Sequence, residues 1–68
     1  MKNAMGQELA STQAELVDIY HKLVDIVRQK GDQLSPFEEH NAKKALGCLW
    51  QIANGLDMDP GQLYDIDV

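Results

Sequence analysis

The sequence has one cysteine, Cys48, among its 68 residues. A single cysteine excludes an intramolecular disulfide, and the chain has no CxxC or CxxH pair to hold a structural zinc ion. A hydrophobic core of this size supplies only about 3–5 kcal/mol of net stability, so additional stabilisation is expected. Oligomerisation is the remaining source, and the lone thiol suits a reducing compartment.

Long hydrophobic runs are lacking as well. No uninterrupted apolar stretch approaches the roughly 18–20 residues that a membrane span needs. Lys2 is the only early base, and no apolar signal-peptide core follows it. We therefore expect a cytoplasmic protein with no membrane partner.

Basic residues are few, with 6 Lys and Arg against 11 Asp and Glu, which gives a net charge of −5. Nucleic-acid binding draws its affinity from Lys and Arg on phosphates, so direct binding to nucleic acid is disfavoured. From Asp57 onward the chain has four aspartates and no base. We expect one helical domain over 1–68 with an acidic C-terminal segment, 57–68.

An amphipathic helix is predicted from residue 9 or 12 to residue 30. Its apolar residues fall in one stripe on a 3.6-residue wheel, with Leu9, Leu16, Tyr20, Leu23 and Val27 at the centre and Val17, Val24, Ile19 and Ile26 on the flanks. The stripe covers about half the circumference, which is more than the roughly 100° of an ordinary surface helix. One partner helix cannot cover it. Arg28 and Lys30 complement the helix dipole, and Gly31 is expected to end the helix.

A second helix is predicted from residue 36 to residue 54. Its start combines a capping Ser35, Pro36 at the first helical position and Glu38 three residues after the cap. One face carries Ala42, Ala45, Leu46, Leu49, Ile52 and Ala53, with Trp50 beside it. Gly55 is expected to stop the helix, with Leu56 as the hydrophobic contact. Because only residues 31–34 join the helices, they should pack antiparallel.

Alternatives remain at both ends of the chain. The first helix either begins near Asn3 or is capped by Ser11 or Thr12, with Glu15 completing a capping box from Thr12. In the second case residues 1–8 are a disordered N-terminus. At the other end, the run from Asp59 to Gln62 repeats the cap signal and predicts a short helix at 60–65, and the alternative is a frayed acidic tail.

The wide stripe predicts an all-α helical hairpin that dimerises into a four-helix bundle. The alternative is that the extra apolar surface waits for a different protein. The candidate interface residues are Leu16, Ile19, Tyr20, Leu23, Ile26, Val27, Leu46, Leu49 and Trp50. A further candidate partner surface consists of His40, Lys43, Lys44, Tyr64, Ile66 and Val68.

Chemistry-bearing residues do not converge. Asp18, His21 and Asp25 share one side of the first helix, but they should be solvated on the face opposite the apolar stripe. Cys48 has no neighbouring histidine to activate it and is expected to be a small core or interface residue. No phosphate loop, nucleophile elbow or nucleotide fingerprint is present. We expect no catalysis, no metal site and no cofactor.

The leading functional hypothesis is a non-enzymatic, regulatory protein–protein interaction protein that binds itself and another cytosolic protein. Its size suits a small accessory protein of a bacterium, phage or plasmid. One alternative is an acidic decoy that occupies the nucleic-acid-binding surface of another protein. Further alternatives are nucleic-acid binding through His40, Lys43 and Lys44, or a metal site using His21 with Asp18 or Asp25.

Overall fold

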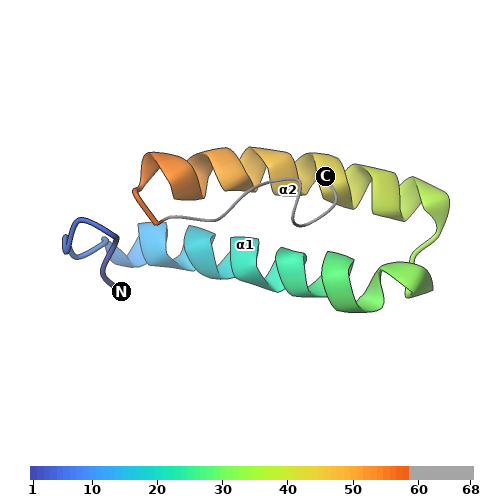
Figure 1. Cartoon of the computed structure of the whole chain (residues 1–68), viewed down its shortest axis with the longest axis horizontal. Helices are drawn as coiled ribbons and strands as arrows, with labels where there is room; N and C mark the ends of the chain where they lie inside the picture. The colour runs from blue at the N-terminus through green and yellow to red at the C-terminus, as the bar shows by residue number, and fades with distance from the viewer. Residues whose placement is uncertain (59–68) are drawn as a thin grey trace.

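A computed structural model describes residues 1–58, which form an antiparallel helical hairpin (Figure 1). Helix α1 spans Ser11–Lys30, a short 3-10 turn η1 spans Gly31–Gln33, and helix α2 spans Pro36–Gly55. The all-α prediction and the antiparallel hairpin are confirmed. The predicted helix at 60–65, with its alternative of a tail, lies outside the described residues.

The start of α2 is formed by the predicted capping box. The Ser35 Oγ accepts a hydrogen bond from the Glu38 N–H at 3.3 Å, and the Glu38 carboxylate accepts one from the Ser35 N–H at 2.9 Å. Two orphan amides at the helix start are thereby satisfied. The backbone hydrogen bond from Ser35, aided by its hydroxyl, lowers the pKa of Glu38.

The start of α1 lies within the predicted range of residues 9 to 12, but its cap differs from the predicted one. The helix begins at Ser11, and the extended N-cap residue is Ala10. Alanine has no side-chain acceptor, so only half of a capping box exists: the Gln13 carboxamide oxygen accepts from the Ala10 N–H at 2.9 Å. The helix starts one residue before Thr12, and the alternative start near Asn3 was wrong because residues 1–9 pair with one another ahead of the helix.

The helix ends also correct the prediction. Gly31 is right-handed, at φ −59°, and continues into η1 instead of adopting a left-handed stop. Although α2 ends at Gly55, the left-handed residue is Asp57, at φ +60°. Its N–H donates to the Asn54 carbonyl at 3.1 Å, and the Met58 N–H donates to the Ala53 carbonyl at 3.0 Å. This is a Schellman ending whose hydrophobic contact is Met58, not Leu56.

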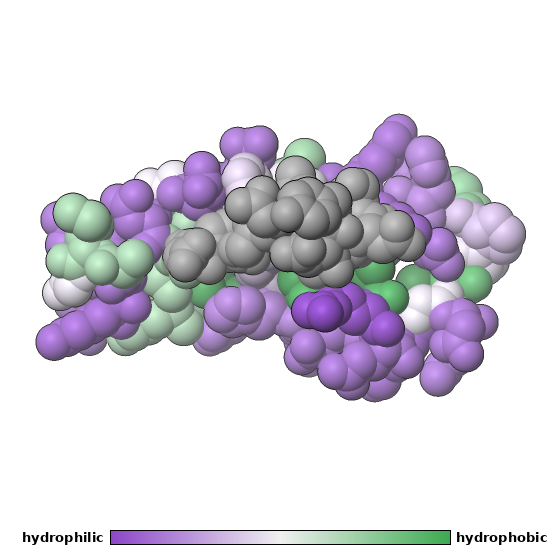
Figure 2. All heavy atoms as spheres, viewed as in Figure 1, coloured by the Kyte–Doolittle hydropathy of each residue, from purple (hydrophilic) through white to green (hydrophobic). Residues whose placement is uncertain are grey.

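The core lies between the two helices. Its buried members are Tyr20, Val27, Leu46 and Ala53, and Val17 is buried as well. Burial raises the pKa of Tyr20. In the view of Figure 2, hydrophobic residues show along the line between the helices, and the outer helix surfaces are mostly hydrophilic. Among the described residues, no helix has the length and apolarity to cross a membrane.

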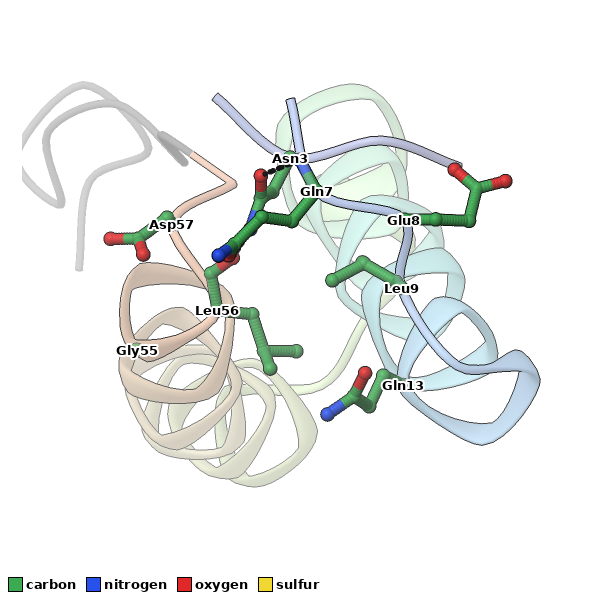
Figure 3. A pocket seen from close by; sticks show the side chains of 8 residues that line it. All are labelled: Asn3, Gln7, Glu8, Leu9, Gln13, Gly55, Leu56 and Asp57. Atoms are coloured by element: carbon green, nitrogen blue, oxygen red, sulfur yellow. Dashed lines mark hydrogen bonds between the residues drawn. The ribbon is translucent and has the colours of Figure 1, made fainter. Parts of the chain in front are cut away.

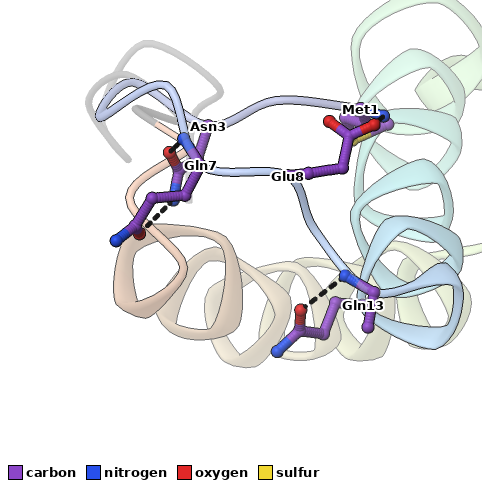
Figure 4. Close-up of polar contacts among 6 residues, drawn as sticks. Met1, Asn3, Gln7, Glu8 and Gln13 are labelled. Atoms are coloured by element: carbon purple, nitrogen blue, oxygen red, sulfur yellow. Dashed lines mark hydrogen bonds and ion pairs between the residues drawn. The ribbon is translucent and has the colours of Figure 1, made fainter.

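Residues 1–9, here called the arm, fold back on themselves before α1 begins. An isolated bridge pairs Lys2 with Glu8, and Gly6 turns the chain at φ +77°. The Asn3 Oδ1 accepts a hydrogen bond from the Met5 N–H at 3.0 Å. It also accepts one from the Gln7 N–H at 2.9 Å (Figure 4). The arm therefore has defined structure through its own polar contacts.

Candidate interaction surface

An apolar surface extends over both helices on one side of the hairpin. It consists of two rows with spacings of three, four and three residues: Leu16, Ile19, Leu23 and Ile26 on α1, and Ala42, Ala45, Leu49 and Ile52 on α2. We call these eight residues the heptad face, because this spacing is that of the a and d positions of a heptad. Ile19 is 52% exposed and Ile52 is 38% exposed. Ala45 is exposed, and the other members are half-buried.

The most exposed rows of the two helices lie on the same side of the hairpin. Each of four residues directly precedes a buried core residue: Ile19 precedes Tyr20, Ile26 precedes Val27, Ala45 precedes Leu46, and Ile52 precedes Ala53. In an α-helix, the residue before a core residue is rotated by about 100° around the helix axis from the direction that faces the core. Two antiparallel helices facing each other are related by a two-fold axis normal to their common plane, so this rotation points to the same side on both.

The predicted interface residues divide into two groups. Tyr20, Val27 and Leu46 are 3%, 9% and 0% exposed, so they are covered within the chain. Trp50 is half-buried against the core. The remaining five lie on the heptad face: Leu16, Ile19, Leu23, Ile26 and Leu49. The apolar stripe read from the sequence therefore contains two sets of residues, those of the hairpin core and those of the neighbouring heptad face.

The predicted basic surface on α2 is modest. His40 and Lys44 are exposed, whereas Lys43 is half-buried and its Nζ lies 3.1 Å from the Glu39 carboxylate one turn earlier. This ion pair offsets part of the positive charge that a phosphate would need. Tyr64, Ile66 and Val68, the other members of that predicted surface, lie outside the described residues.

Asp18, His21 and Asp25 are all exposed, as their wheel positions predicted. Within residues 1–58, no group of three His, Cys, Asp or Glu side chains is placed to hold a metal ion. The His21 ring instead lies beside Tyr20, with 5.5 Å between the ring centroids. Cys48 is exposed and lies near the margin of the heptad face.

A small pocket lies where the arm meets the ends of both helices (Figure 3). Its volume is about 170 Å³, which is below the roughly 300 Å³ at which ligand sites usually begin. The Leu9 and Leu56 side chains point into it, and the Glu8 and Asp57 carboxylates point away. A space lined by leucines and amides has no group for acid–base chemistry, so we regard it as a packing gap between the arm and the helices.

The arm was missed by sequence reasoning. Its organising residue is Asn3, which bonds to its own turn and to the end of α2. A short polar segment ending in Gly6 carries a turn signal, but turn signals do not identify a distant acceptor. The contact to α2 depends on the hairpin bringing both chain ends together.

Comparison with protein-family models, with curated proteins and with solved structures found no match for this chain.

Proposed function

We propose that the chain is a non-enzymatic, regulatory interaction protein that acts as a homodimer, with two hairpins packing their heptad faces into a four-helix bundle. The observation that carries this proposal is the heptad face itself. It places Ile19 and Ile52 in solvent on one side of a hairpin whose own core is already closed. The other surfaces of the dimer, including the acidic C-terminal segment, then remain for a cytosolic partner.

The dimensions of the hairpin support a second copy as the occupant. The molecule measures 38 × 21 × 17 Å, so its broad side has an area on the order of 800 Å². A standard stable interface buries about 800 Å² on each partner. Two hairpins that pack these broad sides together would thus bury an area of the size found in specific interfaces, and no other part of the molecule would need to take part.

The free energy of burying the exposed isoleucines also favours a second copy. Full burial of an aliphatic side chain stabilises by roughly 1.5–3 kcal/mol, and a 68-residue domain is expected to have only a few kcal/mol of its own. Covering Ile19 and Ile52 would contribute a comparable amount. Dimerisation would therefore raise the stability of each hairpin substantially.

The test is sedimentation equilibrium on the purified chain over a range of micromolar concentrations. We expect the mass of a dimer, and we expect Ile19→Gln and Ile52→Gln each to shift the equilibrium toward monomer. His21→Gln is the matched control, because His21 is exposed on α1 away from the heptad face. Monomers at all concentrations with an intact circular dichroism spectrum would refute the proposal.

The acidic C-terminal sequence supports a second candidate function, the decoy for a nucleic-acid-binding surface. Four aspartates and no base occur from Asp57 to the end of the chain. A decoy would bind a basic partner with an affinity that falls steeply as salt is raised, because exposed charges are screened beyond about 10 Å at 0.1 M salt. A pull-down from lysate that is unchanged between low and high salt would exclude this candidate.

A further inference from the structure

We infer that the two-fold axis of the dimer runs perpendicular to the helices, so that α1 packs antiparallel on α1 of the second copy and α2 packs antiparallel on α2. This inference rests on the proposed homodimer and specifies the arrangement of its interface. The alternative has the axis parallel to the helices, with each α1 on the partner's α2. Residue size, the exposed Phe37 and charge all favour the perpendicular axis.

Residue size on the heptad face varies along the hairpin. Both helices have 20 residues, so positions equally far from the connection are level. To within about half a turn, or ~3 Å, this gives four level pairs: Leu16 with Ile52, Ile19 with Leu49, Leu23 with Ala45, and Ile26 with Ala42. The two pairs near the open end are both large, and each pair near the connection has one alanine.

The perpendicular axis balances these volumes. It reverses the second hairpin, so a pair of two large residues always meets a pair that contains one alanine. Every layer then holds three large side chains and one alanine. With the parallel axis, each pair would meet the same pair of the other copy. The layers at the open end would then hold four large residues, and those near the connection would hold two alanines each. Protein interiors keep a nearly uniform packing density, which favours the balanced layers.

Phe37 provides a second observation. Its side chain is 77% exposed at the start of α2, and Gly55, on the same flank at the other end of α2, has no described atom within 4 Å of an added Cβ. With α2 antiparallel on α2, Phe37 of each copy comes to within about half a turn, or ~3 Å, of the level of Gly55 of the other. The glycine leaves a flat backbone surface on which an aromatic ring can lie.

Charge at the edge of the interface also distinguishes the two arrangements. Lys22 lies on the outer flank of α1, and Lys44 lies on the outer flank of α2 at the same level. With a parallel axis, Lys22 would face Lys44 of the other copy. With the perpendicular axis, Lys22 lies about half a turn in height from both Asp18 and Lys22 of the other copy. The perpendicular axis therefore gives the lysine an attractive partner that the parallel axis does not provide.

The test uses spin labels at two positions and pulsed electron paramagnetic resonance. One sample carries the label on the native Cys48, which lies close to the inferred axis. The other carries it on Met5→Cys in a Cys48→Ser background, at the tip of the arm, where Met5 is 71% exposed. We expect a short distance between the two Cys48 labels. The Met5→Cys labels should lie at opposite ends of the bundle, separated by at least the 38 Å length of the hairpin.

A Cys48 distance longer than the Met5→Cys distance would establish the parallel axis and overturn the inference, while leaving the homodimer intact. Monomers without any intermolecular distance would overturn the homodimer itself. Lys22→Glu gives an independent readout by sedimentation. We expect it to weaken the dimer several-fold, because the new carboxylate lies near Asp18 of the other copy. A tighter dimer would instead indicate contact with Lys44 and would also overturn the inference.

Discussion

The Asn3 side-chain amide donates a hydrogen bond to the Leu56 backbone carbonyl at 3.0 Å, across 53 positions of sequence. Beside it, the Ala4 N–H donates to the Asp57 carbonyl at 2.7 Å. The last carbonyls of a helix have no partner inside the helix, so a donor from elsewhere in the chain satisfies them. The arm therefore closes the open end of the hairpin by capping α2.

Asn3→Ala should lower the free energy of unfolding by about 1–2 kcal/mol, because each hydrogen bond of this kind contributes about 0.5–1.5 kcal/mol. The variant loses the hydrogen bond to the Leu56 carbonyl and the two hydrogen bonds that the Asn3 Oδ1 accepts from backbone N–H groups of the arm. Urea denaturation at fixed protein concentration measures it.

Asn3→Asp separates the two roles of Asn3. The carboxylate still accepts from the Met5 and Gln7 backbone amides, but an oxygen replaces the Nδ2 that donates to the Leu56 carbonyl and to the Gln7 Oε1. We expect amide hydrogen exchange to stay slow at Gln7 and a clear loss of stability. If Asn3→Asp were as stable as the native chain, the bond to Leu56 would contribute nothing.

Ala10→Ser should stabilise the protein by about 1 kcal/mol, because a serine N-cap supplies the acceptor that Ala10 lacks. The Gln13 half of the box is already in place, and Ala10 is exposed and extended, as a capping residue should be. Ser35→Ala is the mirror-image change and should cost a similar amount. Thermal melts of the two variants and of the double variant test both effects; equal melting temperatures for Ala10→Ser and the native chain would contradict the first.

The helices were predictable because their signals are local. The Ser35 and Glu38 box lies within four residues, and the apolar period that indicates a helix is read from neighbouring turns. The cap of α1 was not predictable, since Ala10 has no side-chain acceptor and becomes the cap only because the arm ends there. Asp57 was equally hidden, because aspartate adopts a left-handed conformation much less often than glycine.

The candidate surface was predictable only in part. The wide stripe on α1 indicated apolar residues beyond the needs of one partner helix, and of its flank residues Ile19 is exposed whereas Val17 is buried. The stripe could not show which flank stays exposed, because that depends on how the hairpin closes. Tyr20 and Leu46 were therefore included among the interface candidates although both are buried in the core.

Gly47→Ala should stabilise the protein by about 1 kcal/mol. Glycine inside a helix costs roughly that amount relative to alanine, and an added Cβ at Gly47 meets no described atom within 4 Å. A close helix approach at this position, one of the reasons a sequence keeps such a glycine, is not present among the described residues. The measurement is the midpoint of urea denaturation.

The control for Gly47 is the reverse change at an exposed position of the same helix, Gln51→Gly, which should destabilise by a similar amount. A destabilising Gly47→Ala combined with the expected loss for Gln51→Gly would mean that Gly47 contacts something outside the described residues. The heptad face contains neither residue, so the dimer equilibrium should stay unchanged in both variants.

The lowered pKa of Glu38 makes the stability of α2 depend on pH. The hydrogen bonds from Ser35 stabilise the ionised Glu38 carboxylate in the folded chain only. Their contribution to the free energy of unfolding is therefore fully present above the unfolded pKa. It is lost as the pH falls through the lowered folded pKa. Carbon-13 NMR titration should give Glu38 a midpoint below that of an unfolded glutamate, and Ser35→Ala should raise it.

Glu38→Gln tests whether charge matters beyond the capping geometry. Glutamine still reaches back to the Ser35 N–H, so the box remains, but the group no longer titrates. We expect the variant to unfold with a weaker pH dependence in the acidic range than the native chain. An identical pH profile for the two proteins would show that the Glu38 charge contributes nothing to the cap, and the hydrogen-bond geometry at Ser35 would then account for its whole effect.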